Sequence, residues 1–234
     1  MRLAALLSGG KDSLYSMYLA KKHGHKIKYI ISIISENPES YMFHVPNIEF
    51  VKQQAKAMQI PIIQKMTKGI KEEELLDLEK VLKKIRKNID GVVTGAVASV
   101  YQKTRIDKIC EVLELKSIAP LWNTNPEKIL NNMLNENFDI LITAVAAPPM
   151  DENWLGRKLD KRCLNELINL NKLYRISING EGGEYETFVL DCPLFKSKIE
   201  ILDYENFWDK KTNSGFMQFK KIKLVKKNSK SSFL

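Results

Sequence analysis

The start of the chain constrains the fold more than any other segment. A short apolar run over residues 2–7 leads into the loop SGGKDS at residues 8–13, and apolar residues at helical spacing follow at once. Two adjacent glycines let the backbone turn sharply and approach a ligand closely. Free amides at a helix start attract phosphate, because the helix dipole places positive partial charge there. The segment therefore predicts a buried strand, a phosphate-binding loop and a helix in direct succession.

The charged residues of this loop predict its chemistry. Lys11 supplies a positive charge for phosphates. The carboxylate of Asp12 repels phosphates unless it holds Mg2+ or orients the loop, so Asp12 is the candidate Mg2+ ligand. We expect both residues to be catalytic, since electrostatic stabilisation of departing phosphates is the main contribution such a loop can make. The candidate nucleotide-binding residues of the loop are Ser8, Gly9, Gly10, Lys11, Asp12 and Ser13.

Two better-known phosphate motifs do not fit this loop. A Walker A loop has glycine five residues before Gly10 and Ser or Thr after Lys11, but this chain has Ala5 and Asp12 there. The dinucleotide pattern G-x-G-x-x-G cannot be placed around the two glycines either. The loop is therefore of another phosphate-binding class.

Apolar patterning predicts two lobes. Strand-like runs at residues 2–7, 27–34, 61–66, 91–97 and 139–145 alternate with helical patterns. This alternation predicts an α/β fold with a doubly wound, five-stranded parallel sheet, whose ligands bind at the carboxyl ends of the strands. After Pro148-Pro149, a helix at 159–170 and strands at 174–178, 187–190, 199–204 and 216–225 predict a smaller α+β lobe. We expect an ATP-binding domain at 1–147, a substrate-binding domain at 148–227 and a flexible tail at 228–234.

Composition limits the class of protein. The chain has 234 residues and a net charge of +9, from 37 Lys and Arg against 28 Asp and Glu, spread along its length. Such a charge is compatible with nucleic acid or an acidic partner without requiring either. Because no run approaches the roughly 20 apolar residues of a membrane span, we expect a cytoplasmic protein without a membrane partner. The three cysteines match no zinc spacing and read as buried thiols.

The loop at residues 8–13 resembles the S-G-G-x-D-S loop of the ATP pyrophosphatase, or PP-loop, superfamily. This resemblance implies an adenine nucleotide alpha hydrolase-like fold, with ATP and Mg2+ as cofactors. It also implies cleavage of ATP to AMP and pyrophosphate through an adenylate. We expect adenine to lie near backbone at the ends of two strands, around Ser35 and Gly95.

A second motif points to one branch of that superfamily. Residues 179–187, NGEGGEYET, resemble the G-E-G-G-E-Y-E-T segment of the diphthine–ammonia ligase family. Residues 42–44, 95–105 and 120–122 also resemble that family, so the similarity runs from residue 2 to about residue 195. Eukaryotic members are typically longer, with extra C-terminal domains. The chain therefore resembles a compact archaeal-type form.

The resemblance implies ATP-dependent amidation of diphthine, a modified histidine of translation elongation factor 2, by ammonium. Diphthine carries a quaternary ammonium, so acidic and aromatic residues suit its recognition. Tyr185, with Trp122 or Trp154, is the candidate aromatic wall, and Glu184 is the candidate base that takes a proton from ammonium. His44 is a candidate for contact with nucleotide. The candidate substrate-binding residues are Gln102, Arg105, Glu181, Gly182, Gly183, Glu184, Tyr185 and Glu186.

Several alternatives stay open at this point. Gln102 and Arg105 fit either a surface helix face or a clamp for a phosphate or carboxylate. The positive charge also suits a tRNA-modifying adenylating enzyme of the same superfamily, and a non-catalytic ATP-binding protein is the third reading. Lys196, Lys198 and residues 220–227 form a candidate docking surface for elongation factor 2. An oligomer is compatible with the sequence.

Overall fold

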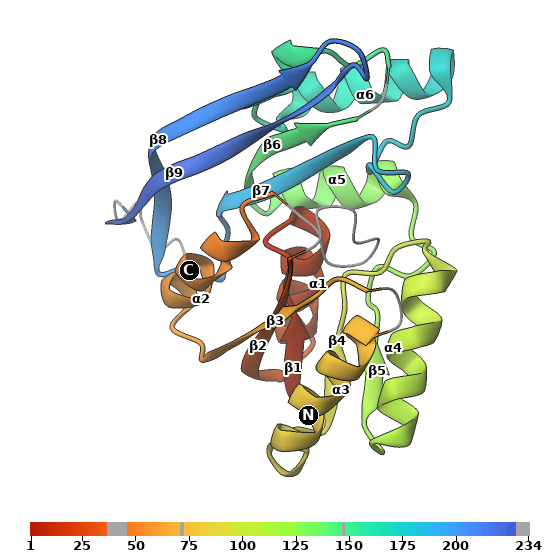
Figure 1. The fold of residues 1–234 in the computed structure, drawn as a ribbon, viewed down its shortest axis with the longest axis vertical. Coiled ribbons are helices and arrows are strands. Elements are labelled where there is room, and N and C mark those ends of the chain that lie inside the picture. Colours follow the sequence, from red (N-terminus) through yellow and green to blue (C-terminus); the bar gives the residue numbers. More distant parts are fainter. Residues whose placement is uncertain (37–45, 71–72, 147, 228–234) are drawn as a thin grey trace.

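The computed structural model describes residues 1–36, 46–70, 73–146 and 148–227 (Figure 1). The predicted tail at 228–234 and the candidate residue His44 lie outside the described residues. None of the helices in the described ranges has the length and apolar character to cross a membrane.

The first lobe is built on a parallel sheet. Its five strands lie in the order β3-β2-β1-β4-β5, and every neighbouring pair is parallel. The chain first adds β2 and β3 on one side of β1 and then adds β4 and β5 on the other side, so the strand order reverses between β1 and β4. The predicted α/β fold is therefore confirmed. The strands are β1 (Arg2–Leu6), β2 (Lys26–Ser35), β3 (Ile62–Thr67), β4 (Gly91–Val93) and β5 (Lys116–Ile118).

Helices cover both faces of this sheet, as expected for a doubly wound fold. The buried side chains of α1 and α2 pack in one hydrophobic cluster, and those of α3 and α4 pack in a second cluster on the opposite face. In each strand, neighbouring residues alternate between these clusters: Ala4 belongs to the second cluster, whereas Leu3 and Ala5 belong to the first. The helices are α1 (Lys11–Lys22), α2 (Val51–Met58), α3 (Glu73–Ile85) and α4 (Val100–Val112).

The assignment of residues 139–145 to the parallel sheet was wrong. These residues form β6 (Asp139–Val145), which pairs antiparallel with β7 and β9 in a separate sheet. The fifth parallel strand is β5, a three-residue edge strand in which Lys116 and Ser117 are exposed. Because β5 has no apolar run, hydrophobic patterning cannot detect it. The apolar run of β6 instead reflects its place inside the second sheet.

The second lobe is an antiparallel sheet with the order β7-β6-β9-β8. Its strands after β6 are β7 (Tyr185–Asp191), β8 (Ser197–Asp209) and β9 (Ser214–Lys226); its helices are α5 (Pro126–Asn135) and α6 (Lys161–Tyr174). The predicted strand at 174–178 is absent, since Tyr174 ends α6 and Arg175 takes a left-handed φ of 62°. Ile176 is buried from a loop, where its carbonyl accepts a hydrogen bond from Asn171.

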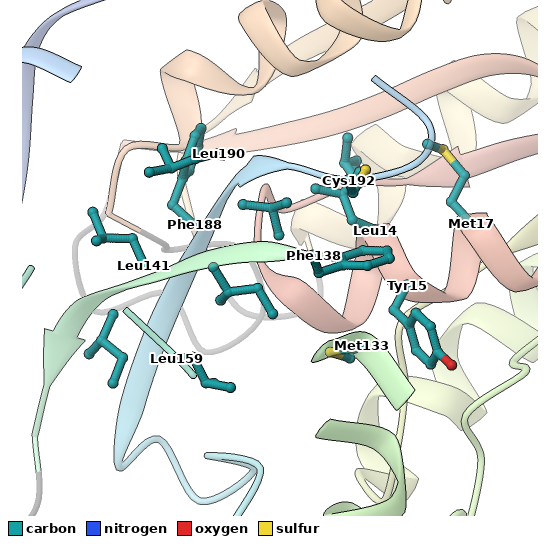
Figure 2. Packing of buried hydrophobic residues seen from close by; sticks show 14 of the residues in the cluster. Leu14, Tyr15, Met17, Met133, Phe138, Leu141, Leu159, Phe188, Leu190 and Cys192 are labelled. Atoms are coloured by element: carbon teal, nitrogen blue, oxygen red, sulfur yellow. The ribbon is translucent and has the colours of Figure 1, made fainter. Parts of the chain in front are cut away.

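One hydrophobic cluster joins the two lobes (Figure 2). Tyr15 of α1 meets the ring of Phe138, just before β6, edge to face at a centroid distance of 5.5 Å. Phe188 of β7 is fully buried and packs closely against Gly9. A Cβ atom added at Gly9 would lie 3.1 Å from the Phe188 ring. The phosphate loop is thus packed directly against the second lobe.

Candidate active site

A cavity of about 1100 Å3 lies between the lobes at the carboxyl edge of the parallel sheet. The loops after β1 and β4 line it from the first lobe, and these strands flank the point where the strand order reverses. Ligands of doubly wound sheets bind at this point. Residues 179–183 and 185–187 and the tip of the β8–β9 hairpin line the cavity from the second lobe.

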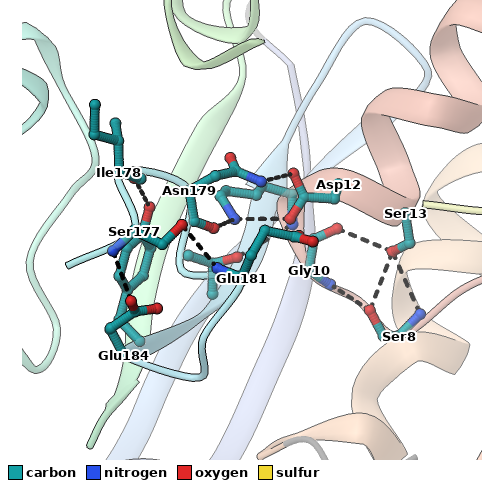
Figure 3. Close-up of polar contacts among 12 residues, drawn as sticks. Ser8, Gly10, Asp12, Ser13, Ser177, Ile178, Asn179, Glu181 and Glu184 are labelled. Carbon is teal, nitrogen blue, oxygen red and sulfur yellow. Dashed lines mark hydrogen bonds and ion pairs between the residues drawn. The ribbon is translucent and has the colours of Figure 1, made fainter. Parts of the chain in front are cut away.

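The phosphate loop begins where β1 ends, and its serines bond to one another (Figure 3). The hydroxyl oxygens of Ser8 and Ser13 lie 3.2 Å apart, and Ser13 Oγ donates to the carbonyl of Gly10 at 3.0 Å. Gly9 has a φ of +91°, a conformation that suits glycine. Ser8, Gly10 and Ser13 line the cavity together with Lys11 and Asp12.

Strand β7 holds the loop from behind. The amide of Val189 donates to the carbonyl of Gly9 at 3.1 Å, and the amide of Lys11 donates to Thr187 Oγ1 at 3.2 Å. Gln54 of α2 is fully buried and its Nε2 donates to the carbonyls of both Gly9 and Val189, at 3.0 and 2.9 Å. Sequence reasoning missed Gln54, because a glutamine in an amphipathic helix carries no signal of a contact made across two lobes.

Lys11 and Asp12 form a largely buried polar network with Asn179. Figure 3 shows Asp12 beside Asn179. The ammonium of Lys11, 4% exposed, donates to Asp12 Oδ2 and to the carbonyl of Asn179, both at 2.7 Å. The side chain of Asn179 donates to Asp12 Oδ1 at 2.9 Å. Its own Oδ1 is buried and accepts no hydrogen bond from the described residues. Asn179 was not among the predicted site residues, although it begins the acidic motif.

Glu184 has a structural position in the acidic loop. Its carboxylate accepts hydrogen bonds from the amides of Ser177 and Gly182, at 2.6 and 2.9 Å, and it is not among the described residues that line the cavity. Gly182, Gly183 and Glu181 do line it. In this conformation Glu184 fixes the shape of the loop, so its assignment as a base has no geometric support here.

Glu186 and Glu181 present carboxylates to the cavity. Burial raises the pKa of Glu186 to about 7, with Asp12 and Glu181 adding to the rise and Lys11 opposing it. Burial, followed by the charge of Asp12, also raises the pKa of Glu181, whose Oε2 accepts a hydrogen bond from the amide of Ala98 at 3.1 Å. Tyr185 is fully buried behind them, with its hydroxyl on the carbonyl of Ile178 at 2.7 Å.

The cavity is negative although the whole chain is positive. The described charged side chains that line it are Lys11, Asp12, Glu181, Glu186 and Asp209. Four carboxylates thus face one ammonium, which already pairs with Asp12. Such a site favours cations, or phosphates that arrive with a metal ion.

The described residues include no group of three His, Cys, Asp or Glu side chains placed to hold a metal ion by themselves. Asp12 nevertheless fits Mg2+, because this ion prefers oxygen ligands and usually takes only one or two protein carboxylates beside phosphates and water.

The remaining predicted residues divide into two groups. Gly95 and Gln102 line the cavity, whereas Ser35 and Arg105 are not among its described lining residues. Arg105 instead stacks on the ring of Tyr101, with its guanidinium carbon 3.4 Å from the ring centroid.

The candidate tryptophans do not form the predicted aromatic wall. Trp122 lies beside Lys103 and Trp154 beside Arg157, and neither is among the described lining residues. The described aromatic residues that line the cavity are Tyr185, Phe207, Trp208 and Phe216, of which the last three come from the β8–β9 hairpin.

Three of the seven lysines in the predicted basic docking surface form ion pairs. Lys220, Lys223 and Lys227 form ion pairs with Glu205, Glu200 and Asp191 respectively. This pairing lowers the positive charge that the surface offers to a nucleic acid.

Replacing Gly95 by Ala is expected to weaken nucleotide binding. A Cβ atom there would lie 2.6 Å from the amide nitrogen of Ser13, so the loop after β4 and the start of α1 must separate. We expect the dissociation constant for ATP, measured by calorimetry, to rise about fivefold to a hundredfold, since overpacking of this kind typically costs about 1–3 kcal/mol. The control is Gly24→Ala, at a position that is not among the described lining residues. Its φ of +81° strains an alanine backbone, but no atom lies within 4 Å of the added Cβ, so this variant introduces strain without overpacking near the nucleotide. Equal ATP affinity in the two variants would contradict the prediction.

Comparison with known proteins gives the family. The model of the diphthamide synthase N-terminal domain matches residues 1–117, and that of the C-terminal domain matches residues 125–225. The human diphthine–ammonia ligase is 37% identical over 86% of this chain and 83% of the relative. The zebrafish (Danio rerio) diphthine–ammonia ligase is 33% identical over 95% of this chain and 96% of the relative, so a compact form also occurs in a eukaryote.

A solved structure is similar at a lower level. The predicted subunit of tRNA methyltransferase from Methanocaldococcus jannaschii is 18% identical over 82% of this chain and 97% of that chain, with a TM-score of 0.42. The family rests on the sequence comparisons. The two family models together cover most of this chain, and the human and zebrafish relatives exceed 30% identity over most of their lengths. The chain therefore belongs to the diphthamide synthase family of ATP-dependent, amide-forming ligases.

Proposed function

We propose that this enzyme amidates the carboxylate of diphthine on translation elongation factor 2, in the cytoplasm, using ammonium and ATP and releasing AMP and pyrophosphate. One observation carries the proposal: the phosphate loop and the acidic motif of residues 179–187 line the same cavity and bond to each other through Lys11, Asp12 and Asn179. The activity named for the relatives agrees with it.

The reaction divides into two displacements. An oxygen of the diphthine carboxylate attacks the α-phosphorus of ATP, and the bond to pyrophosphate breaks. Ammonia then attacks the carbonyl carbon of the acyl-adenylate, and the bond to AMP breaks. The nitrogen loses one proton before this attack, as ammonium, and one after it. Lys11 and the amides of the phosphate loop stabilise the negative charge that leaves with pyrophosphate.

The ammonium subsite lies among the acceptors on the second-lobe side. Asn179 Oδ1 lacks a donor among the described residues, and the half-buried carboxylate of Glu186 faces the same cavity. An ammonium ion has only donors, so it satisfies such acceptors. Because the pKa of Glu186 is raised to about 7, this carboxylate is suited to accept a proton from ammonium near neutral pH.

Mg2+ fits the same arrangement. Asp12 would hold it together with phosphate oxygens, and the ion would neutralise part of the phosphate charge in a cavity whose charged lining residues are mainly carboxylates. Asp12 keeps a free lone pair on each oxygen beside its bonds to Lys11 and Asn179, so it contributes to the ion without losing the network.

The direct test is AMP and pyrophosphate release from ATP, with and without ammonium and diphthine-bearing elongation factor 2. We expect AMP only when both are present, with one amide formed per AMP and the mass decrease that accompanies replacement of hydroxyl by amino. AMP formation that requires tRNA instead, with binding that weakens steeply as salt rises, would overturn the proposal in favour of a tRNA-modifying enzyme. ATP binding without AMP formation under every condition would favour a non-catalytic protein.

A further inference from the structure

The β8–β9 hairpin brings an aromatic pair to the cavity. Phe207 and Phe216 face each other across the hairpin, with ring centroids 5.0 Å apart and an interplanar angle of 23°. Both line the cavity, yet they are 43% and 39% exposed. Trp208 and Asp209 line it beside them. Large apolar side chains left exposed at a cavity are typical of a ligand-binding surface.

The hairpin is held in place at several points. Asn47 of the first lobe donates to the carbonyl of Met217 at 2.8 Å and accepts from the amide of Phe219 at 2.7 Å. At the other end, Asn213 donates to the carbonyl of Met150 at 3.0 Å. Phe216 itself pairs with Ala144 of β6. The aromatic pair is therefore a fixed surface that needs little ordering when a ligand binds.

We propose that Phe207 and Phe216 bind the quaternary ammonium group of the acceptor side chain, with Asp209 as its counter-charge. This inference rests on the proposed function, which supplies an acceptor with such a group. A quaternary ammonium donates no hydrogen bond, so aromatic faces and nearby carboxylates are the groups that recognise it. The negative lining of the cavity draws the same cation inward.

Asp209 is suited to this role. Its carboxylate accepts hydrogen bonds from the amide of Lys211 and the hydroxyl of Thr212, at 2.8 and 2.9 Å, and these bonds lower its pKa. It therefore stays charged at neutral pH. The proposed surface and the phosphate loop line one cavity, so an acceptor held by its cation can present its carboxylate to ATP in the same space.

The inference is tested by two probes of equal shape and different charge. Choline and its neutral isostere 3,3-dimethylbutan-1-ol are titrated into the wild type, Phe207→Leu and Phe216→Leu, with binding followed by NMR. We expect the wild type to prefer choline and each Leu variant to lose roughly tenfold of that preference. Phe207→Tyr keeps the ring and is expected to keep the preference. Tyr204→Leu is the control, because Tyr204 is 53% exposed on β8 and is not among the described lining residues.

The same variants are then assayed for amide formation. The Leu variants should raise KM for diphthine-bearing elongation factor 2 about tenfold, with unchanged ATP affinity. Equal binding of the two probes by the wild type, or a loss of ATP affinity in the Leu variants, would overturn the inference and indicate a neutral ligand or adenine at the aromatic pair. If the choline preference holds but the wild type forms no amide, the proposed function fails and the cation site stands.

Discussion

Replacing Lys11 by Met is expected to lower kcat/KM for AMP formation by about a hundredfold to a thousandfold. This is the usual effect of removing one preorganised donor from a site where negative charge develops. Lys11 is nearly fully buried and directs two of its three N–H donors to Asp12 and to the carbonyl of Asn179. The third donor and the charge remain for phosphate. Met keeps most of the length of the side chain, so the change mainly removes the charge.

A stability measurement separates this effect from damage to the fold. Among the described residues, Lys11→Met leaves the side chain of Asp12, which is 21% exposed, with the hydrogen bond from Asn179 alone. Removing one partner of a buried pair typically costs about 3–5 kcal/mol, and partial exposure places Asp12 at the low end of that range. The double variant Lys11→Met/Asp12→Asn removes both charges and is expected to recover thermal stability but not AMP formation. Near-normal AMP formation by Lys11→Met alone would contradict a catalytic role for Lys11.

Local sequence was enough to predict the part of the first lobe that contains the phosphate loop. The run at residues 2–7, the glycines and the helix that follows are neighbours in the chain, so their geometry is set by backbone preferences alone. The prediction failed for β5 and β6, because the position of each strand in the folded protein, and not its local sequence, decides which sheet it joins. The short polar edge strand β5 needs little hydrophobicity, whereas β6 is apolar because the second sheet buries it.

The second-lobe half of the site was harder to predict from sequence. Glu184 and Glu186 are two residues apart in the same motif, and periodicity does not distinguish them. The backbone turn before β7 directs Glu184 to the amides of its own loop, whereas Glu186 lies in β7 and faces the cavity. The aromatic wall was predicted from Tyr185 with Trp122 or Trp154. Tyr185 lines the cavity and the two tryptophans do not, whereas the other described aromatic lining residues come from the β8–β9 hairpin. No local sequence pattern indicates which hairpin lines the cavity.

Glu186→Gln is expected to lower amide formation by about a hundredfold at neutral pH, the usual contribution of a general base. The deficit should shrink as the pH approaches the pKa of ammonium, because free ammonia then needs no base before it attacks. Rate measurements with ammonium at increasing pH check this. Glu184→Gln is the matched control two residues away: it weakens the bonds that hold the acidic loop, so its deficit should stay constant with pH. A constant deficit for Glu186→Gln would contradict its role as the base.

The raised pKa of Glu186 also predicts an effect on stability with a definite sign. The pKa is about 7 in the folded protein against the ordinary value of 4.5, so the folded state holds this proton more tightly than the unfolded state. Between these two values the unfolded state loses the proton first, and stability therefore falls as the pH rises. Glu186→Gln lacks this loss. Its melting temperature relative to the wild type should therefore increase between about pH 5 and about pH 8. If the difference in melting temperature between Glu186→Gln and the wild type stays flat over this range, Glu186 titrates with an ordinary pKa. It would then not be suited to act as a base near neutral pH.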